Sequence, residues 1–408
     1  MNKRLLSTII REMPKIFTEP TYIPKLLDGA PLDSGLPYSA VLIDAHYIFF
    51  REGIVERTKT VYPNVIIDPV TYFLQFPQHC AKASFKKLPY SGASNIRKVL
   101  SDPSFRLNSL IVPSIKFQQE SGATFVIAPY LCSDDMSGEV SMNNITMLGE
   151  SLYAIKEWEN KPKIFAPICI SGNMLSDKPL RDYIVDIYKE DSFYSKIHGY
   201  FIILFDFDDR YADEEQLLGL ADVTYQLSQD KDVLINHIGG FGEVLDAIGA
   251  SGFISSPGGG ETLSLKQMKQ GKTGWKRDHN EWRYIPEVFA YVNEDLLKAD
   301  KINYQCSCLG CTDPGLFSST EAAKKRHFLV RRMQAIAELQ GKSREERINL
   351  MIERLERAKR KAMRYNTQFG AKMQTAHINN WIKVLERAKA WSYENDDDEL
   401  EKLLKQLD

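Results

Sequence analysis

Three cysteines and one histidine near the carboxyl end of the chain have the types and spacing of a metal site. Cys306, Cys308 and Cys311 fall within six residues, and His327 follows them. Four such ligands complete a tetrahedral Zn²⁺ site of the structural kind, because no position is left for water or substrate. A disulfide framework is the weaker alternative, since a Cys-x-Cys pair is badly placed to bridge to itself. We therefore predict a structural zinc site that pins the helix beginning at His327 to the cysteine loop.

Carboxylates at the ends of apolar runs are the candidates for catalysis. Asp68 closes the run Val65–Asp68, and Asp206 closes the run Tyr200–Asp206. An unpaired carboxylate inside such a run is costly, so both positions favour a functional role. Asp208 lies just beyond the second run, where an aspartate that caps the following helix is an equal alternative.

Other polar or flexible residues follow the same kind of run and are predicted to bind substrate. The set comprises Tyr72, Ser171, Asp208, His237, Gly239 and Gly240. His237 also fits a hydrogen-bonded interior histidine. The three glycines after Pro257 are typical of a flexible loop, because the spacing of a phosphate-binding loop is absent.

Eight short β-branched or aromatic runs provide the frame for these residues. They are Ala40–Asp44, Val65–Asp68, Phe125–Ala128, Ile164–Ile170, Tyr200–Asp206, Val233–His237, Phe253–Ser255 and Val288–Val292. Helix-like segments separate most of them, which predicts an α/β fold, a (β/α)8 TIM barrel with chemistry at the carboxyl ends of its strands. A doubly wound sheet is the alternative, but no glycine-rich dinucleotide fingerprint follows the first run.

Length and composition fit one large barrel with an appendage. We expect an N-terminal helix and connection over 1–37, the catalytic barrel over 38–300, a zinc-binding subdomain over 301–340, and basic helices with an acidic tail over 341–408. Of the 408 residues, 43% are hydrophobic and 26% are charged, as in ordinary globular proteins. No apolar run has the length of a membrane span and the start of the chain has no signal-peptide cleavage site, so we expect a cytoplasmic protein.

Basic residues cluster after the cysteines, although the formal net charge of the chain is only −2. One interpretation is a solvated helix face with ion pairs one turn apart. The other is a platform that contacts phosphates. The second interpretation selects as nucleic-acid contacts Lys324, Lys325, Arg326, Arg331, Arg332, Arg357, Arg360 and Lys361.

A barrel followed by a Cys-x-Cys-x-x-Cys motif and a histidine helix resembles the tRNA-guanine transglycosylase family, over about Val41 to Glu338. The segment Val65-Ile-Ile-Asp68-Pro-Val-Thr-Tyr72 falls where that family has an aspartate, two glycines and an aromatic residue. The resemblance implies that Asp68 is the acid/base aspartate and that Tyr72 stacks on the bound base. The segment from His237 to Leu245 is similar to the family's glycine turn.

The chain also departs from the family pattern. The strand that carries the family's nucleophilic aspartate reads Phe253-Ile-Ser-Ser256 and has no carboxylate. The glycine-rich turn after the fifth strand is replaced by residues 204–209. These differences indicate a divergent paralogue, most like the DpdA group, which places 7-deazaguanine into DNA.

The resemblance implies a glycosyltransferase that exchanges guanine in nucleic acid for a 7-deazaguanine base such as preQ0, with DNA favoured and tRNA open. Asp68 would act as acid/base or nucleophile and Asp206 would stabilise the sugar or recognise the base, because the glycosidic bond breaks through an oxocarbenium-like state. Structural Zn²⁺ is the expected cofactor. A homodimer and partner proteins of a DNA-modification system are compatible with this interpretation.

Two other functions stay open. One is a catalytically inactive, transglycosylase-like subunit that binds nucleic acid, which the missing nucleophile favours. The other is an unrelated barrel enzyme stabilised by metal that acts on a small phosphorylated substrate, against which the extended basic stretch argues.

Overall fold

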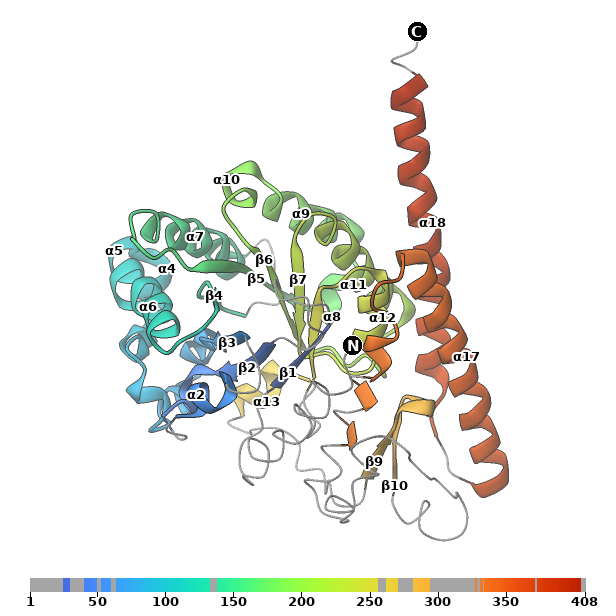
Figure 1. Ribbon diagram of the computed structural model, residues 1–408. Helices are drawn as coiled ribbons and strands as arrows, with labels where there is room; N and C mark the ends of the chain where they lie inside the picture. Colours follow the sequence, from blue (N-terminus) through green and yellow to red (C-terminus); the bar gives the residue numbers. More distant parts are fainter. Residues whose placement is uncertain are drawn as a thin grey trace.

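The computed structural model describes residues 25–29, 40–49, 53–59, 64–132, 138–255, 262–270, 282–293, 327–328, 331–332, 334–370 and 373–404. Its centre is a barrel-like sheet surrounded by helices (Figure 1). The strands are β1 (Lys25–Gly29), β2 (Ala40–Asp44), β3 (Asn64–Asp68), β4 (Phe125–Ile127), β5 (Lys163–Ser171), β6 (Gly199–Phe205), β7 (Asp232–Asn236) and β8 (Gly252–Ser255).

The order of the strands makes this an α/β barrel that resembles a TIM barrel. Strands β2 to β8 follow one another around the sheet and each pairs in parallel with the next. Strand β1 lies between β8 and β2, antiparallel to both, and closes the barrel. The predicted α/β class and barrel-like sheet are confirmed, with seven parallel strands among those described.

One of the eight predicted barrel strands was wrong, and one was missed. The run Val288–Val292 lies outside the barrel, in the short helix η7 (Pro286–Val288) and in β10 (Ala290–Asn293), which pairs with β9 (Trp282–Ile285). Phe289 breaks the run because its φ of 47° is left-handed and incompatible with a strand. Its place in the barrel is taken by β1, which lies within the residues predicted to be a helix and connection.

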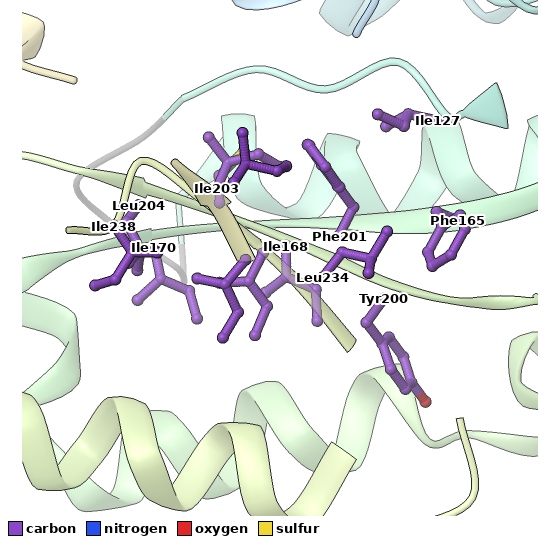
Figure 2. Close-up of a cluster of buried hydrophobic side chains, with 14 of the residues drawn as sticks. Ile127, Phe165, Ile168, Ile170, Tyr200, Phe201, Ile203, Leu204, Leu234 and Ile238 are labelled. Atoms are coloured by element: carbon purple, nitrogen blue, oxygen red, sulfur yellow. The ribbon is translucent and has the colours of Figure 1, made fainter. Parts of the chain in front are cut away.

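Burial on both faces explains why the strands read as continuous apolar runs. All of β6 is buried, as is β5 from Ile164 to Ser171. Side chains of β5, β6 and β7 gather in one cluster that includes Ile168, Leu204 and Leu234 (Figure 2). A parallel strand covered by helices outside and by barrel core inside has no solvent-facing position.

Helices follow most of the strands, as the helix-like segments between the apolar runs predicted. Four of them are α7 (Glu139–Ala154), α9 (Lys178–Tyr188), α11 (Glu214–Leu227) and α12 (Phe241–Ile248). The other α-helices around the barrel are α2 (Ile54–Lys59), α3 (Pro77–Cys80), α4 (Ile96–Ser101), α5 (Pro103–Arg106), α6 (Val112–Glu120), α8 (Gly172–Leu175), α10 (Asp191–Tyr194) and α13 (Leu265–Lys269). Short 3₁₀ helices form η1 (Ala45–Tyr47), η2 (Thr71–Gln75), η3 (Phe85–Lys87) and η4 (Ser91–Ser94), and η5 (Leu107–Ile111) is a short π-helix. Within the described ranges, no helix is both long and apolar enough to cross a membrane.

Two long helices, α17 (Arg344–Phe369) and α18 (Ala376–Leu404), run side by side along one flank of the barrel (Figure 1). Trp381 of α18 anchors them, because its indole N–H donates to the Asp209 carbonyl at 3.2 Å and its ring covers Gly240. The Asp209 carboxylate in turn accepts a hydrogen bond from the Phe241 amide at 2.8 Å, at the start of α12. The loop after β6, the start of α12 and the start of α18 therefore form one packed unit.

The docking of α18 should make stability depend on pH through His377. Burial, reinforced by the Arg210 guanidinium, lowers the pKa of His377 from 6.5 to about 4. Between these two values the folded protein binds fewer protons than the unfolded chain, so stability falls as the pH falls from about 6.5 to 4. We expect His377→Asn to remove about 2–3 kcal/mol of this loss, measured by urea unfolding across that window.

Asp209→Asn provides a comparison of opposite sign. Burial raises the pKa of Asp209 to about 6, so this group makes the folded state less stable as the pH rises from about 4 to 6. Removing it should steepen the rise in stability over that range. A pH profile that neither variant changes would contradict both assignments.

Candidate active site at the barrel mouth

Two aspartates lie next to each other at the mouth, which we define as the carboxyl end of the parallel strands. Asp44 ends β2 and Asp68 ends β3, and the two are register partners. Register partners on parallel strands direct their side chains to the same face of the sheet. The carboxyl ends of barrel strands are where such folds place catalytic groups.

Asp68 is completely buried, and its carboxylate is held by donors from the neighbouring loops. Its Oδ1 accepts hydrogen bonds from the Tyr130 hydroxyl at 2.7 Å and from the Val70 amide at 2.8 Å. Donors of this kind offset the cost of removing a carboxylate from water. The sequence selected Asp68 as the central acid, and the structure places this carboxyl group in a buried, hydrogen-bonded environment. Its catalytic role stays a prediction.

The loops after β3 and β4 are fastened to each other around Asp68. The Thr71 hydroxyl donates to the Tyr130 carbonyl at 2.7 Å and accepts from the Tyr130 amide at 2.8 Å. The Gln75 side chain makes the same two-way exchange with the backbone of Cys132, at 2.8 Å each way. Tyr130 is thus held in position to donate to Asp68. It was missed in the sequence because it lies on a different strand loop.

Tyr72 lies in the same cluster, but it faces another aromatic ring. Its ring stacks on Tyr130 with centroids 5.7 Å apart, and both side chains are buried. Burial raises the pKa of the Tyr72 hydroxyl well above its usual value, and the carboxylates of Asp68 and Asp44 raise it further. A base that stacks on Tyr72 must therefore displace or shift Tyr130.

Two thiols complete this cluster. Cys132 follows β4 and Cys169 lies on β5, and both are buried. Burial raises the pKa of the Cys169 thiol, with Cys132 and then Asp68 adding to the effect. A raised pKa keeps the Cys169 thiol and the Tyr72 and Tyr130 phenols protonated at neutral pH, so these three groups do not accept protons.

Asp206 does not join this cluster, because β6 ends one residue earlier, at Phe205. Asp206 is exposed and has a left-handed φ of 46°. Its amide donates to the Leu263 carbonyl at 2.6 Å, and its carboxylate accepts from the Leu265 amide at 3.1 Å. The expected burial of Asp206 was therefore wrong, and the residue anchors the segment that follows β8. Its catalytic role stays a prediction.

That segment, residues 262–270, lies across the mouth and is called the strap below. Asp206 holds one end at β6, and the Gln78 side chain in α3, beyond β3, donates to the Met268 carbonyl. Because β4 and β5 lie between β3 and β6, a segment joined to both crosses the opening. Its apolar side chains, Leu263, Leu265 and Met268, are buried.

The other predicted substrate-binding residues have structural contacts of their own. Ser171 is buried and caps α8 by accepting from the Met174 amide at 3.4 Å, while Asp208 forms an ion pair with Arg210 at 2.7 Å. His237 is buried with a left-handed φ of 64°.

The two glycines after β7 serve the packing of the C-terminal region. The Gly239 carbonyl accepts from Arg332 at 3.2 Å. A side-chain carbon at position 240 would lie 2.7 Å from the Trp381 ring, so only glycine fits there. The glycine turn resembling the transglycosylase motif thus allows Trp381 to approach the backbone.

The three cysteines of the predicted zinc site lie outside the described residues, as do Lys324, Lys325 and Arg326. His327 is described and is buried in a helical turn. In the part of the chain that the structure describes, no group of three or more His, Cys, Asp or Glu side chains is placed to hold a metal ion. The Cys₃His zinc site stays a prediction.

The predicted nucleic-acid contacts divide into buried and exposed residues. Arg332 is 1% exposed, faces Glu243 at 3.5 Å and lies over the Phe253 ring, so the prediction of a surface contact was wrong for this residue. Arg331 forms an ion pair with Glu287 at 2.8 Å. On α17, the remaining three lie at the surface: Arg357 and Arg360 are exposed and Lys361 is half-buried.

A scan of the chain against known protein families finds no match, and a search among curated proteins finds no relative. A chemical role for the mouth is therefore inferred only from the arrangement of its side chains.

Replacing Arg332 should destabilise the fold, because it leaves the buried Glu243 without its counter-charge. We expect Arg332→Ala to cost about 3–5 kcal/mol in urea unfolding. The neighbouring Arg331→Ala removes a half-exposed ion pair and should cost about 1 kcal/mol or less. Equal losses in the two variants would contradict the buried role of Arg332.

Loss of the Asp206 carboxylate should loosen the strap while the barrel stays folded. We expect Asp206→Ala to speed hydrogen exchange of the Leu265 amide about tenfold, because one hydrogen bond to a charged acceptor is lost. Asp206→Asn keeps an acceptor oxygen and tolerates the left-handed backbone, so its exchange should stay close to that of the wild type. Equal exchange in all three proteins would show that the strap does not depend on this anchor.

Proposed function

We propose that this protein is a base-exchange transglycosylase that replaces guanine in nucleic acid, with DNA favoured over tRNA, by a 7-deazaguanine base. The observation that carries the proposal is the buried carboxylate of Asp68 at the mouth, held by Tyr130 and Val70 and paired in register with Asp44. In this proposal the fold is a variant of the (β/α)8 barrel, and Cys306, Cys308, Cys311 and His327 bind structural Zn²⁺.

The reaction needs two functions that carboxyl groups can supply. The bond between the sugar carbon and the departing guanine breaks, and a carboxylate stabilises the positive charge on the sugar or bonds to it. A second carboxyl group gives a proton to the departing base and takes one from the incoming base as the new bond forms. Asp68 supplies one function. Asp44, its register partner, is better placed for the other than the exposed Asp206.

Substrate entry requires the mouth to open, because Asp68 and Tyr72 are both buried. In the proposed mechanism the strap moves away and its side chains Leu263, Leu265 and Met268 leave the mouth. Such closure over a reaction site excludes water, which protects a glycosyl intermediate from hydrolysis. For the strap to move, its hydrogen bonds to Asp206 and Gln78 must break and its three buried apolar side chains must leave their contacts.

An inactive nucleic-acid-binding subunit is the second candidate function. It is favoured by β8, whose described residues Gly252 to Ser255 offer no carboxylate where the resembling family has its nucleophile. A protein of this kind would bind nucleic acid and keep the buried cluster at the mouth, but it would not catalyse base exchange.

Base exchange can be measured by incorporation of labelled guanine or a labelled 7-deazaguanine into DNA or tRNA. We expect Asp68→Asn to lower the rate by about 10²–10⁴-fold, since an amide can neither transfer the proton nor stabilise the charge on the sugar as a carboxylate does. Tyr130→Phe should lower it by about tenfold or more, because one donor to the carboxylate is lost.

Tyr90→Phe is the matched control, because it also removes a buried phenol, one that donates to the Pro69 carbonyl at 2.7 Å and not to Asp68. Its rate should stay within about threefold of the wild type. Wild-type turnover in Asp68→Asn would rule out the assigned role. No incorporation despite tight nucleic-acid binding would favour the inactive subunit.

A further inference from the structure

A groove of about 630 Å³ runs between α17 and α18. Six of its nine lining residues have polar or charged side chains, and Met363 is its one large apolar side chain that is mainly exposed. Its walls are formed by Glu356, Lys359, Arg360, Met363, Ala376, Asn379, Asn380, Ile382 and Lys383.

The groove carries an excess of positive charge. Arg360 forms an ion pair with Glu356 at 3.5 Å, and Lys383 forms one with Glu214 at 2.8 Å. Within the described chain, no carboxylate forms an ion pair with Lys359. The same holds for three further cations on the adjoining face of α17, which are Arg357, Lys361 and Arg364. From Arg357 to Arg364 the helix has five basic residues and no acidic one.

These cations are spread along the helix and not gathered at one point. Arg364 lies seven positions after Arg357, which corresponds to about 10 Å of helix at 1.5 Å per residue. Asn379 and Asn380 add amide donors from the opposite wall. A row of cations with amide donors suits a series of phosphates, which proteins bind with these side chains.

The groove lies toward the mouth of the barrel. Arg344, at the start of α17, donates to the Ile248 carbonyl at 3.0 Å, at the end of α12 that is remote from the mouth. The groove residues of α17 are further along the helix, beside the start of α18 (Figure 1). Trp381, next to Asn380, packs on the loop that follows β6 at the mouth.

We propose that the α17–α18 groove binds the sugar–phosphate backbone of a nucleic acid and guides it past the mouth. The guiding part rests on the proposed base exchange, whereas the binding itself does not. A nucleic acid fits better than a membrane or a protein partner, because the groove offers a row of cations and amide donors that match a series of phosphates.

The test is fluorescence anisotropy with the full-length protein and a labelled DNA of about 20 nucleotides, single-stranded and as a duplex, and the matching RNA. Lys359→Gln combined with Arg360→Gln should weaken binding about tenfold at low salt. Two lost phosphate contacts should also make the slope of log K against log salt shallower by about 2 on the duplex.

Lys196→Gln combined with Lys342→Gln is the control, since it removes the same charge from two exposed lysines outside the groove. This control should bind as the wild type does. Thermal melting of both double variants checks that they are folded.

The outcomes separate the groove from the catalytic proposal. If the groove variant kept the affinity and the salt slope of the wild type, or if the control lost as much affinity as the groove variant, the proposed binding in the groove would be wrong. Equal displacement of the DNA by polyglutamate would overturn its assignment to nucleic acid. Binding that depends on the groove, without base exchange, would support the proposal that the groove binds nucleic acid and would contradict the proposed transglycosylase activity.

Discussion

Keeping a carboxylate out of water is the constraint on which the mouth of this barrel depends. Asp68 has no exposed surface, and its stabilisation requires Tyr130 and the Val70 amide to point at the same oxygen. Those donors are in place only because Thr71 and Gln75 tie the loop after β3 to the loop after β4. The barrel supplies the rigid strand ends from which both loops start.

The same end of the barrel holds most of the backbone strain in the described chain. Val70, Asp206 and His237 all have left-handed φ values, and each follows a parallel strand at the mouth. For residues other than glycine, this conformation costs on the order of 1 kcal/mol or more and persists only where the surroundings enforce it. At Val70 the strain turns an amide toward Asp68, and at Asp206 it turns the chain toward the strap.

The barrel and the position of Asp68 could be predicted because both follow from patterns of neighbouring residues in the sequence. Apolar runs that are buried on two faces appear as continuous hydrophobic stretches, and an aspartate that ends one is visible without knowledge of the fold. Strand β1 was missed since Lys25–Gly29 has no β-branched or aromatic residue to mark it. The opposite error occurred at Val288–Val292, where the composition fits a strand but Phe289 turns the chain.

The rest of the site depends on contacts between distant parts of the chain. Tyr130 is 62 residues from Asp68, so no spacing rule could have paired them. Arg332 was assigned to the surface from its neighbours in sequence, whereas burial against Glu243 and Phe253 gives it a structural role. Asp206 differs from Asp68 by a single step at the strand end, and that step decides whether the carboxylate is buried or exposed.

The central claim is that the cluster around Asp68 binds a purine-like base, and calorimetry of free guanine and a free 7-deazaguanine base tests it most directly. Binding to the wild-type protein should weaken about tenfold or more in Asp68→Asn and stay nearly unchanged in Tyr90→Phe, because only the first alters the carboxylate. Binding of equal strength in all three proteins, or no binding to any of them, would contradict the claim.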